Sequence, residues 1–212
     1  MHVTASDGSN LNRDVALNMD VHDASAGVED DWIFYGDSIT AAAMAQTHRG
    51  AGTFAQQIDA MTKHFPIQEN GGIPSLTSRD GVNHIRQWLG LFPGTYVALS
   101  YGTNDAGWGI PPQDFYNNYV GMVRAVLQAG KIPVIPTIPW GRTANIQKNG
   151  PGLNAKIDEL YRTFPQVIRG PDLWAYFAQH PSLISSDGIH PTDEGFAAYR
   201  RQWVEDVVSK IY

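Results

Sequence analysis

Two short segments carry side chains that can act together as a nucleophile and its base. The tetrapeptide GDSI at residues 36–39 follows the apolar run at residues 32–35, and DGIH at residues 187–190 lies near the end of the chain. A buried strand that stops at Gly-Asp-Ser presents a hydroxyl at the end of a sheet. Serine becomes a nucleophile when a histidine base and a carboxylate can reach it. We therefore predict Ser38 as a nucleophile, with a helix cap as the alternative, since Asp37 and Ser38 both suit the start of a helix over residues 39–44.

His190 is the predicted base. Asp187 precedes it by three residues and can accept the proton on the ring nitrogen that faces away from Ser38. That contact fixes the tautomer and stabilises the imidazolium. The alternative is a surface Asp-Gly turn followed by a histidine before Pro191. The other six histidines lack this pattern and are predicted to be surface or structural.

Acyl transfer also needs hydrogen-bond donors for the developing oxyanion. Asn104 follows the apolar run at residues 96–100, and we place it in a loop with Gly102, where its amide can donate without carrying charge. Asp105 is expected to hold that loop by hydrogen bonds. The alternative for Asn104 is a turn residue that bonds its own backbone. The segment NGGIPS at residues 70–75 can likewise turn a backbone N–H toward the oxyanion or merely form a turn.

Alternating strands and helices must position these groups. Strands are predicted at residues 32–35, 66–69, 96–100, 132–138 and 166–168. Apolar residues at helical spacing predict a helix near residues 115–126 and another near 196–207, the second capped by Thr192. Five strands separated by helices predict an α/β fold, a three-layer α/β/α sandwich with about five parallel strands. Reactive sites in such sheets lie at the C-terminal ends of the strands.

The length of 212 residues suits one domain with a large core. Residues 1–30 are polar apart from an alternation of Leu17, Met19 and Val21, which suits a half-buried strand. We predict that residues 1–30 form an N-terminal extension, either the tail of a preceding β module or an edge strand of the same domain. Residues 31–212 are predicted to form the main domain.

Charge and composition exclude several classes of partner and site. The net charge is -6 and there is no Lys/Arg cluster, which argues against a nucleic-acid partner. No apolar run is long enough to span a bilayer. The first residues lack the pattern of a signal peptide, but an excised domain of a secreted protein would look the same, so the compartment stays open. The chain has no cysteine, which excludes disulfides and zinc-thiolate sites.

The chemistry predicted for these residues requires no cofactor or metal ion. Metal-binding spacings such as His-Glu-x-x-His are absent, as are a Walker loop and a Gly-x-Ser-x-Gly elbow. The segment GPGLNA at residues 150–155 superficially matches a dinucleotide fingerprint. It follows no predicted strand and contains a proline, so we interpret it as a turn into a helix.

Taken in order, these segments resemble the sequence blocks of the SGNH hydrolases, a branch of the GDSL lipases and esterases. Block one corresponds to GDSI at residues 36–39, with Ile where the family often has Leu. Block three corresponds to GTND at residues 102–105, and block five to DGIH at residues 187–190. The resemblance implies a flavodoxin-like sandwich over residues 31–212 and catalytic roles for Ser38, Asp187 and His190. It also implies oxyanion donation from the Ser38 backbone, a block-two residue and the Asn104 side chain.

Block two departs from the family pattern Asn-x-Gly-x-x-Gly, whose last glycine gives its N–H to the oxyanion. Ser75 stands at that position. Its backbone N–H is still available, but a positive φ angle would cost serine strain that glycine avoids. Gly72 is the fallback donor.

The resemblance implies hydrolysis of a carboxylic ester through an acyl-serine intermediate. Trp108, Trp140 and Trp174 follow predicted strands and are candidates to line the substrate site, with core or rim packing as the alternative. The first hypothesis is a short-chain or carbohydrate O-acetyl esterase, because the chain lacks a long apolar lid segment. The others are a lysophospholipase or thioesterase, and a non-catalytic carbohydrate-binding module. The expected partner is a small-molecule or glycan ester, and the oligomeric state stays open.

Overall fold

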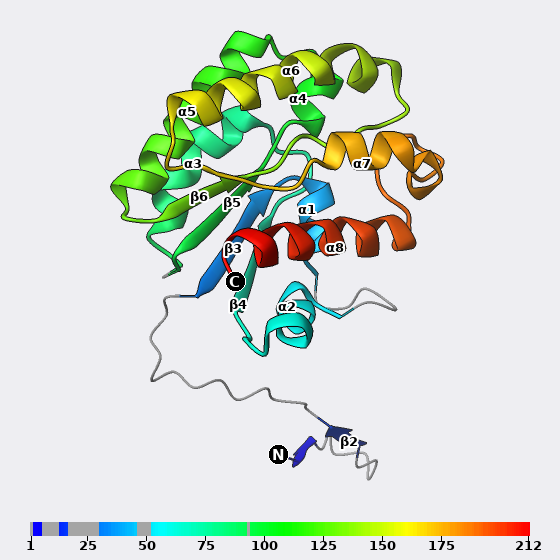
Figure 1. Cartoon of the computed structure of the whole chain (residues 1–212). Coiled ribbons are helices and arrows are strands. Elements are labelled where there is room, and N and C mark those ends of the chain that lie inside the picture. The colour runs from blue at the N-terminus through cyan, green and yellow to red at the C-terminus, as the bar shows by residue number, and fades with distance from the viewer. Residues whose placement is uncertain (1, 6–12, 17–29, 46–51, 93) are drawn as a thin grey trace.

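The computed structural model describes residues 2–5, 13–16, 30–45, 52–92 and 94–212. Its centre is a parallel sheet with the strand order β4-β3-β5-β6-β7 (Figure 1). The strands are β3 (Asp31–Gly36), β4 (Ile67–Gly72), β5 (Tyr96–Ser100), β6 (Ile132–Ile135) and β7 (Ile168–Arg169). The predicted α/β/α sandwich with five parallel strands is therefore confirmed. The fourth strand ends three residues earlier than predicted.

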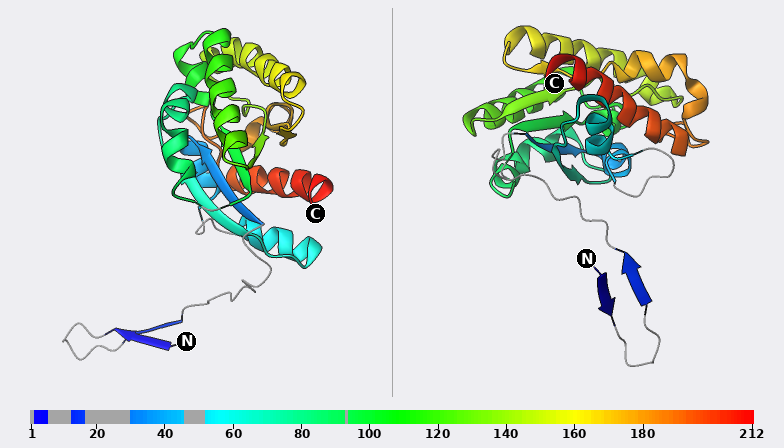
Figure 2. Two further views of the ribbon diagram at one scale, coloured as in Figure 1. Left: turned by 90° about the vertical axis from the view of Figure 1, so that its left-hand side faces the viewer. Right: turned by 60° about the horizontal axis from the view of Figure 1, so that its bottom comes forward.

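Helices cover both faces of this sheet, as the views in Figures 1 and 2 show. One face carries α3 (Ser78–Leu89), α4 (Thr103–Trp108), α5 (Pro112–Gln128) and α6 (Ala144–Thr163). The other carries α1 (Ser38–Ala43), α2 (Phe54–Thr62), α7 (Leu173–Gln179) and α8 (Asp193–Lys210), with a short 3₁₀ turn, η2 (Pro181–Leu183), before α8.

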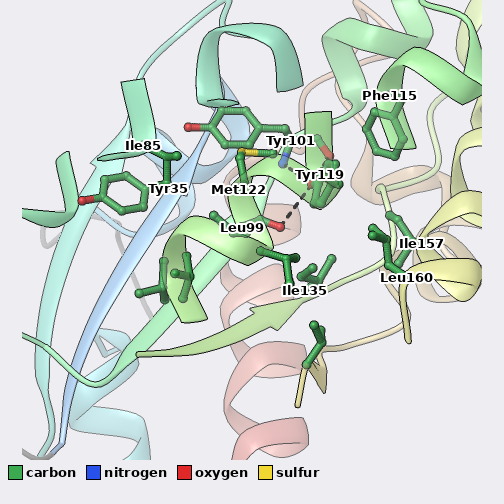
Figure 3. Close-up of a cluster of buried hydrophobic side chains, with 14 of the residues drawn as sticks. Tyr35, Ile85, Leu99, Tyr101, Phe115, Tyr119, Met122, Ile135, Ile157 and Leu160 are labelled. Atoms are coloured by element: carbon green, nitrogen blue, oxygen red, sulfur yellow. Dashed lines mark hydrogen bonds between the residues drawn. The ribbon is translucent and has the colours of Figure 1, made fainter. Parts of the chain in front are cut away.

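Successive side chains of a strand point to opposite faces of the sheet, so β3 contributes to a separate hydrophobic core on each face. In β3, Ile33 and Tyr35 pack toward α3 and α5, whereas Trp32 and Phe34 pack toward α2 and α8. Because every residue of β3 is buried, the strand appears in the sequence as a continuous apolar run rather than an alternating one. Figure 3 shows the first of these cores, which gathers side chains of β3, β5 and β6 and of α3, α5 and α6.

The predicted helix faces lie in these cores. Phe115, Tyr119, Met122 and Val126 of α5 are fully buried. Tyr119 also fixes the end of β5: its hydroxyl accepts from the Tyr101 N–H at 3.0 Å and lies within donating distance of the carbonyls of Leu99 and Tyr101 (Figure 3). The strand end from which the block-three segment starts is thereby anchored to α5.

The last helix also follows its prediction. Phe196, Tyr199, Trp203 and Val207 of α8 are buried on the other face of the sheet. The Thr192 hydroxyl caps this helix by accepting from the Gly195 N–H at 3.1 Å.

The segment at residues 150–155 was predicted as a turn into a helix, and that prediction is wrong. It lies inside α6, which continues through Pro151. Leu153 and Ile157 are fully buried, and Gly150 lies so close to Trp174 that a Cβ there would come within 2.3 Å of the indole. Packing on both sides of the proline therefore overrides its unfavourable helix propensity.

Near the N-terminus, β1 (His2–Ala5) and β2 (Arg13–Ala16) pair with each other in antiparallel register. Neither belongs to the five-stranded sheet. The alternation predicted at residues 17–21 lies outside the described residues. Among the helices that the structure describes, none combines the length and apolar character required to cross a bilayer.

Candidate active site

The register of the sheet brings three loops together. Gly36, the last residue of β3, pairs with Gly72 of β4 on one side and with Ser100 of β5 on the other. The segments that carry Ser38, Ser75 and Asn104 therefore all leave the same edge of the sheet, at the C-terminal ends of neighbouring strands. Parallel α/β sheets place ligands at this edge.

Helix α1 begins at the candidate nucleophile. Asp37 is the N-cap, and its Oδ1 accepts from the Ile39 N–H at 2.9 Å. Ser38 is the first residue of the helix, so its own N–H has no acceptor within the helix. The capping role considered for this segment thus belongs to Asp37, which leaves the Ser38 hydroxyl for other contacts. Burial raises the pKa of Asp37 to about 7, although the Ile39 N–H opposes that effect.

The hydroxyl of Ser38 is in contact with the predicted base. Ser38 Oγ lies 2.8 Å from His190 Nε2, across 152 residues of sequence. On the other side of the ring, His190 Nδ1 lies 2.7 Å from Asp187 Oδ2. With a proton on Nδ1 donated to Asp187, Nε2 is free to accept from Ser38. The structure therefore brings together the three residues that the sequence singled out.

Asp187 is held by donors on its other oxygen. Its Oδ1 accepts from the N–H groups of Ile189 and His190, at 2.8 and 2.9 Å, and from the Ser185 hydroxyl at 2.8 Å. Partial burial alone would raise the pKa of Asp187, but these donors and the His190 ring outweigh it and hold the pKa below its ordinary value. Asp187 is therefore an ionised acceptor for the imidazole at neutral pH.

A second loop braces the segment that carries Asp187 and His190. The Arg142 N–H donates to the Gly188 carbonyl at 2.7 Å, and the Arg142 guanidinium donates to the Ser185 carbonyl. Gly188 has a φ of 75°, and a Cβ on Gly141 would come within 2.9 Å of the Gly188 carbonyl oxygen. The close approach of the two loops thus requires glycine at residue 141, and the positive φ favours glycine at residue 188. Sequence reasoning missed this contact because each half lies in an irregular loop.

The block-two segment reaches the same edge. The Ile73 N–H donates to the Gly36 carbonyl at 3.0 Å, which fixes the start of the loop to the end of β3. Ser75 is exposed and has a φ of 68°, the left-handed conformation considered in the sequence analysis. The N–H of Gly72, the fallback donor, is already bonded to Asn70 Oδ1 at 3.0 Å.

Asn104 lies in the first turn of α4 rather than in a loop, so the predicted local structure is wrong. The helix starts directly after Gly102, whose φ of 134° makes the sharp turn out of β5. Asn104 Nδ2 donates to the Leu76 carbonyl at 2.8 Å. An amide NH₂ has two hydrogens, so the second remains for a ligand.

Asp105 holds its segment by hydrogen bonds, as expected, and its partner across the site is Ser78. It is fully buried and accepts from Ser78 at the start of α3: from the N–H at 3.0 Å and from the hydroxyl at 2.5 Å. Two successive residues of block three, Asn104 and Asp105, therefore form hydrogen bonds with the segment that follows block two.

Trp108, one of the three candidate tryptophans, lines a cavity. Trp108 is 65% exposed and borders a cavity of about 350 Å³ together with Asn104, Ile189 and residues 143–146. No lining side chain carries a formal charge. Trp140 and Trp174 instead pack against the two cores. Within the described residues, no group of three or more histidine or acidic side chains is placed to hold a metal ion.

Comparison with known protein families identifies the family to which this chain belongs. The family model of the GDSL-like lipases and acylhydrolases matches residues 34–198. The chain belongs to this family. The match spans all three segments whose geometry is described above, and it confirms the resemblance inferred from them.

Solved structures of esterases and acylhydrolases share the fold at low sequence identity. The esterase EstA from Pseudoalteromonas sp. superposes with a TM-score of 0.71 at 16% identity, covering 85% of this chain and 98% of its own. A lipase/acylhydrolase from Enterococcus faecalis gives 0.68 at 18% identity, covering 85% and 96%. The acetylxylan esterase Axe2 from Geobacillus stearothermophilus gives 0.69 at 17% identity, covering 85% and 95%. No curated protein sequence matches the chain significantly.

Proposed function

We propose that this member of the GDSL-like family is a serine esterase that hydrolyses short-chain carboxylic esters through an acyl-Ser38 intermediate. The observation that carries the proposal is the continuous contact from the Ser38 hydroxyl through His190 to Asp187. Membership of a lipase and acylhydrolase family agrees with ester chemistry at that serine.

In the first half-reaction, Ser38 Oγ attacks the ester carbonyl carbon while His190 Nε2 takes the hydroxyl proton. Asp187 stabilises the resulting imidazolium through Nδ1. The oxyanion accepts hydrogen bonds from the backbone N–H groups of Ser38 and Ser75 and from the Asn104 amide. Collapse of the tetrahedral intermediate breaks the bond to the alcohol oxygen, which leaves with the proton held by His190.

In the second half-reaction, His190 removes a proton from water, and the hydroxide formed attacks the acyl-Ser38 carbonyl. The carboxylic acid leaves and Ser38 regains its proton from His190. The cycle uses only side chains and backbone groups of this chain together with water.

The cavity beside Asn104 supports an ester of an uncharged alcohol. Its lining has no formal charge to pair with a phosphate, which argues against the lysophospholipase alternative. The exposed indole of Trp108 offers a flat surface on which a sugar ring can stack. The similarity in fold to an acetylxylan esterase agrees with an O-acetyl ester on carbohydrate.

The test compares initial rates on p-nitrophenyl esters from acetyl to decanoyl and on an acetylated xylo-oligosaccharide, with Ser38→Ala as the background. A Ser38-dependent rate that is highest for acetyl, with release of acetate from the oligosaccharide, supports the proposal. A maximum at decanoyl would favour the lipid or thioester alternative. Binding of the oligosaccharide without cleavage of any ester would favour the non-catalytic module.

A further inference from the structure

We propose that Asp105 is a positioning residue of the oxyanion hole, which holds the loop at residues 75–78 so that the Ser75 N–H faces the reacting carbonyl. The inference rests on the proposed function and deepens it. Asp105 does not touch the substrate itself, because it is fully buried.

The loop needs such a restraint because of Ser75. Its φ of 68° lies in the left-handed region, which costs an L-residue free energy that glycine avoids. The Ser75 side chain is exposed. A strained backbone conformation persists only when the contacts of the surrounding structure hold it in place. Contacts of the residues that follow Ser75 must therefore maintain the direction of its N–H.

Those contacts come from successive residues of α4. Asn104 Nδ2 donates to the carbonyl of Leu76, the residue directly after Ser75, at 2.8 Å. Asp105 accepts from the N–H and the hydroxyl of Ser78, at 3.0 and 2.5 Å. Asn118 of α5 then donates to the same Ser78 hydroxyl at 2.9 Å, so that this hydroxyl both donates and accepts.

Asp105 couples the two parts of the proposed oxyanion hole. Asp80 also bonds this loop, through the N–H and hydroxyl of Thr77, but it belongs to α3 and so ties the loop only to its own helix. Asp105 belongs to α4, the helix that carries Asn104. It therefore fixes the Ser75 N–H relative to the Asn104 amide, which is the relation that a shared oxyanion requires.

An ordinary structural role makes a different prediction. If Asp105 only caps the start of α3, its loss lowers stability but leaves the rate per folded molecule unchanged. If it positions Ser75, its loss lowers kcat, and the loss depends on the strain at residue 75. A glycine at that position has no strain to relieve, so the loop should keep its direction without Asp105.

The experiment is a double-mutant cycle of Asp105→Asn and Ser75→Gly, measured as kcat and KM on p-nitrophenyl acetate. Asparagine keeps an acceptor for the Ser78 N–H but presents its NH₂ group to the Ser78 hydroxyl. Loss of one whole oxyanion donor costs about 10²–10³-fold in kcat, so a displaced donor should cost about 10–30-fold with little change in KM. In the Ser75→Gly background, the same substitution should cost less than about threefold.

Asp31→Asn is the matched control. Asp31 is also a buried carboxylate, 4% exposed, but it is the first residue of β3 and lies at the opposite end of that strand from Ser38. We expect wild-type kcat for it. Ser78→Ala is the second variant if Asp105→Asn does not fold. It removes the hydroxyl with its bonds to Asp105 and Asn118 but keeps the Ser78 N–H on Asp105. It should lower kcat about 3–10-fold, again with rescue by Ser75→Gly.

The outcomes separate the two proposals. A wild-type kcat in folded Asp105→Asn, or an equal loss with serine and glycine at residue 75, overturns the positioning role while a Ser38-dependent wild-type rate stands. Absence of any Ser38-dependent rate in the wild-type protein overturns both.

Discussion

Replacing Asp187 by asparagine tests how the carboxylate acts on the histidine. Every described contact of Asp187 is with a donor: two backbone N–H groups and the Ser185 hydroxyl on Oδ1, and His190 Nδ1 on Oδ2. An asparagine can keep its carbonyl oxygen on the three donors of the loop. Its NH₂ group then faces His190 Nδ1, which must become the acceptor.

The reversal moves the histidine proton to Nε2, the atom that lies 2.8 Å from Ser38 Oγ. A protonated Nε2 cannot accept the serine proton. In a triad of this kind, the wrong tautomer lowers kcat by about 10⁴, which corresponds to about 5 kcal/mol of transition-state stabilisation. Because the loop donors stay satisfied, we expect Asp187→Asn to fold and to lose about 10³–10⁴-fold in kcat on p-nitrophenyl acetate at neutral pH.

The control is Ser185→Ala, which removes one donor from Asp187 Oδ1 and leaves the contact between Oδ2 and His190 unchanged. A hydrogen bond to a charged group contributes about 1.5–3 kcal/mol to stability, but the two backbone donors still hold Oδ1 and the His190 contact that fixes the tautomer is kept. We therefore expect kcat to stay within about fivefold of wild type. Circular dichroism and thermal unfolding establish that both variants are folded. A folded Asp187→Asn variant with kcat within tenfold of wild type would refute the proposed role of the carboxylate.

Three further predictions follow from single residues. Asn104→Ala should lower kcat on p-nitrophenyl acetate by about 10²–10³ with little change in KM, and a loss seen only in KM would contradict oxyanion donation. Ser75→Gly relieves about 1–2 kcal/mol of left-handed strain and costs about 0.5–1 kcal/mol in unfolded-state entropy. Urea titration should therefore show a free energy of unfolding about 0.5–1 kcal/mol higher than in wild type, and a lower value would argue against strain at that position. Asp37→Asn keeps the cap on Ile39 but removes a carboxyl whose pKa is about 7 in the folded state and about 3.9 when unfolded. Because the folded state holds that proton more tightly, wild-type stability should fall relative to Asp37→Asn as the pH rises from 4 to 7, and a pH-independent difference in urea titrations would contradict the shift.

The predictable part of the structure lies in short segments whose local pattern carries the signal. The apolar run at residues 32–35 becomes β3 because both faces of a central parallel strand are buried. The spacing of Asp187 and His190 predicts their contact because three residues of one tight loop suffice to make it. The position of Ser38 just beyond the end of β3 was predictable because its segment directly follows that apolar run.

Helix α4 was not predictable in the same way. Its sequence TNDAGW contains Asn, Asp and Gly, which are weak helix formers. The helix is completed from outside: Asn149 donates to the Ala106 carbonyl at 2.7 Å and Asn145 to the Gly107 carbonyl at 2.8 Å. These side chains satisfy the last carbonyls of α4 from α6, about 40 residues later in the chain. A local pattern does not contain that information.

The contacts that hold the site together are also long-range. Asp105 reaches Ser78 across 27 residues, and Arg142 reaches Gly188 across two irregular loops. Residue type alone gives Asp105 a choice of partners, and only the register of β3 with β4 and β5 decides which loop lies next to it. The sequence therefore singles out the candidate residues, and the tertiary structure determines what positions them.

The most direct test of the central claim is to trap the acyl-enzyme. The protein is mixed with p-nitrophenyl acetate, quenched in acid within the first turnover and analysed by intact mass and peptide mapping. We predict one added acetyl group on Ser38 in the wild-type protein and none in a folded Ser38→Ala variant that has also lost ester hydrolysis. Hydrolysis that persists in Ser38→Ala, or an acetyl group on another residue, would contradict the account.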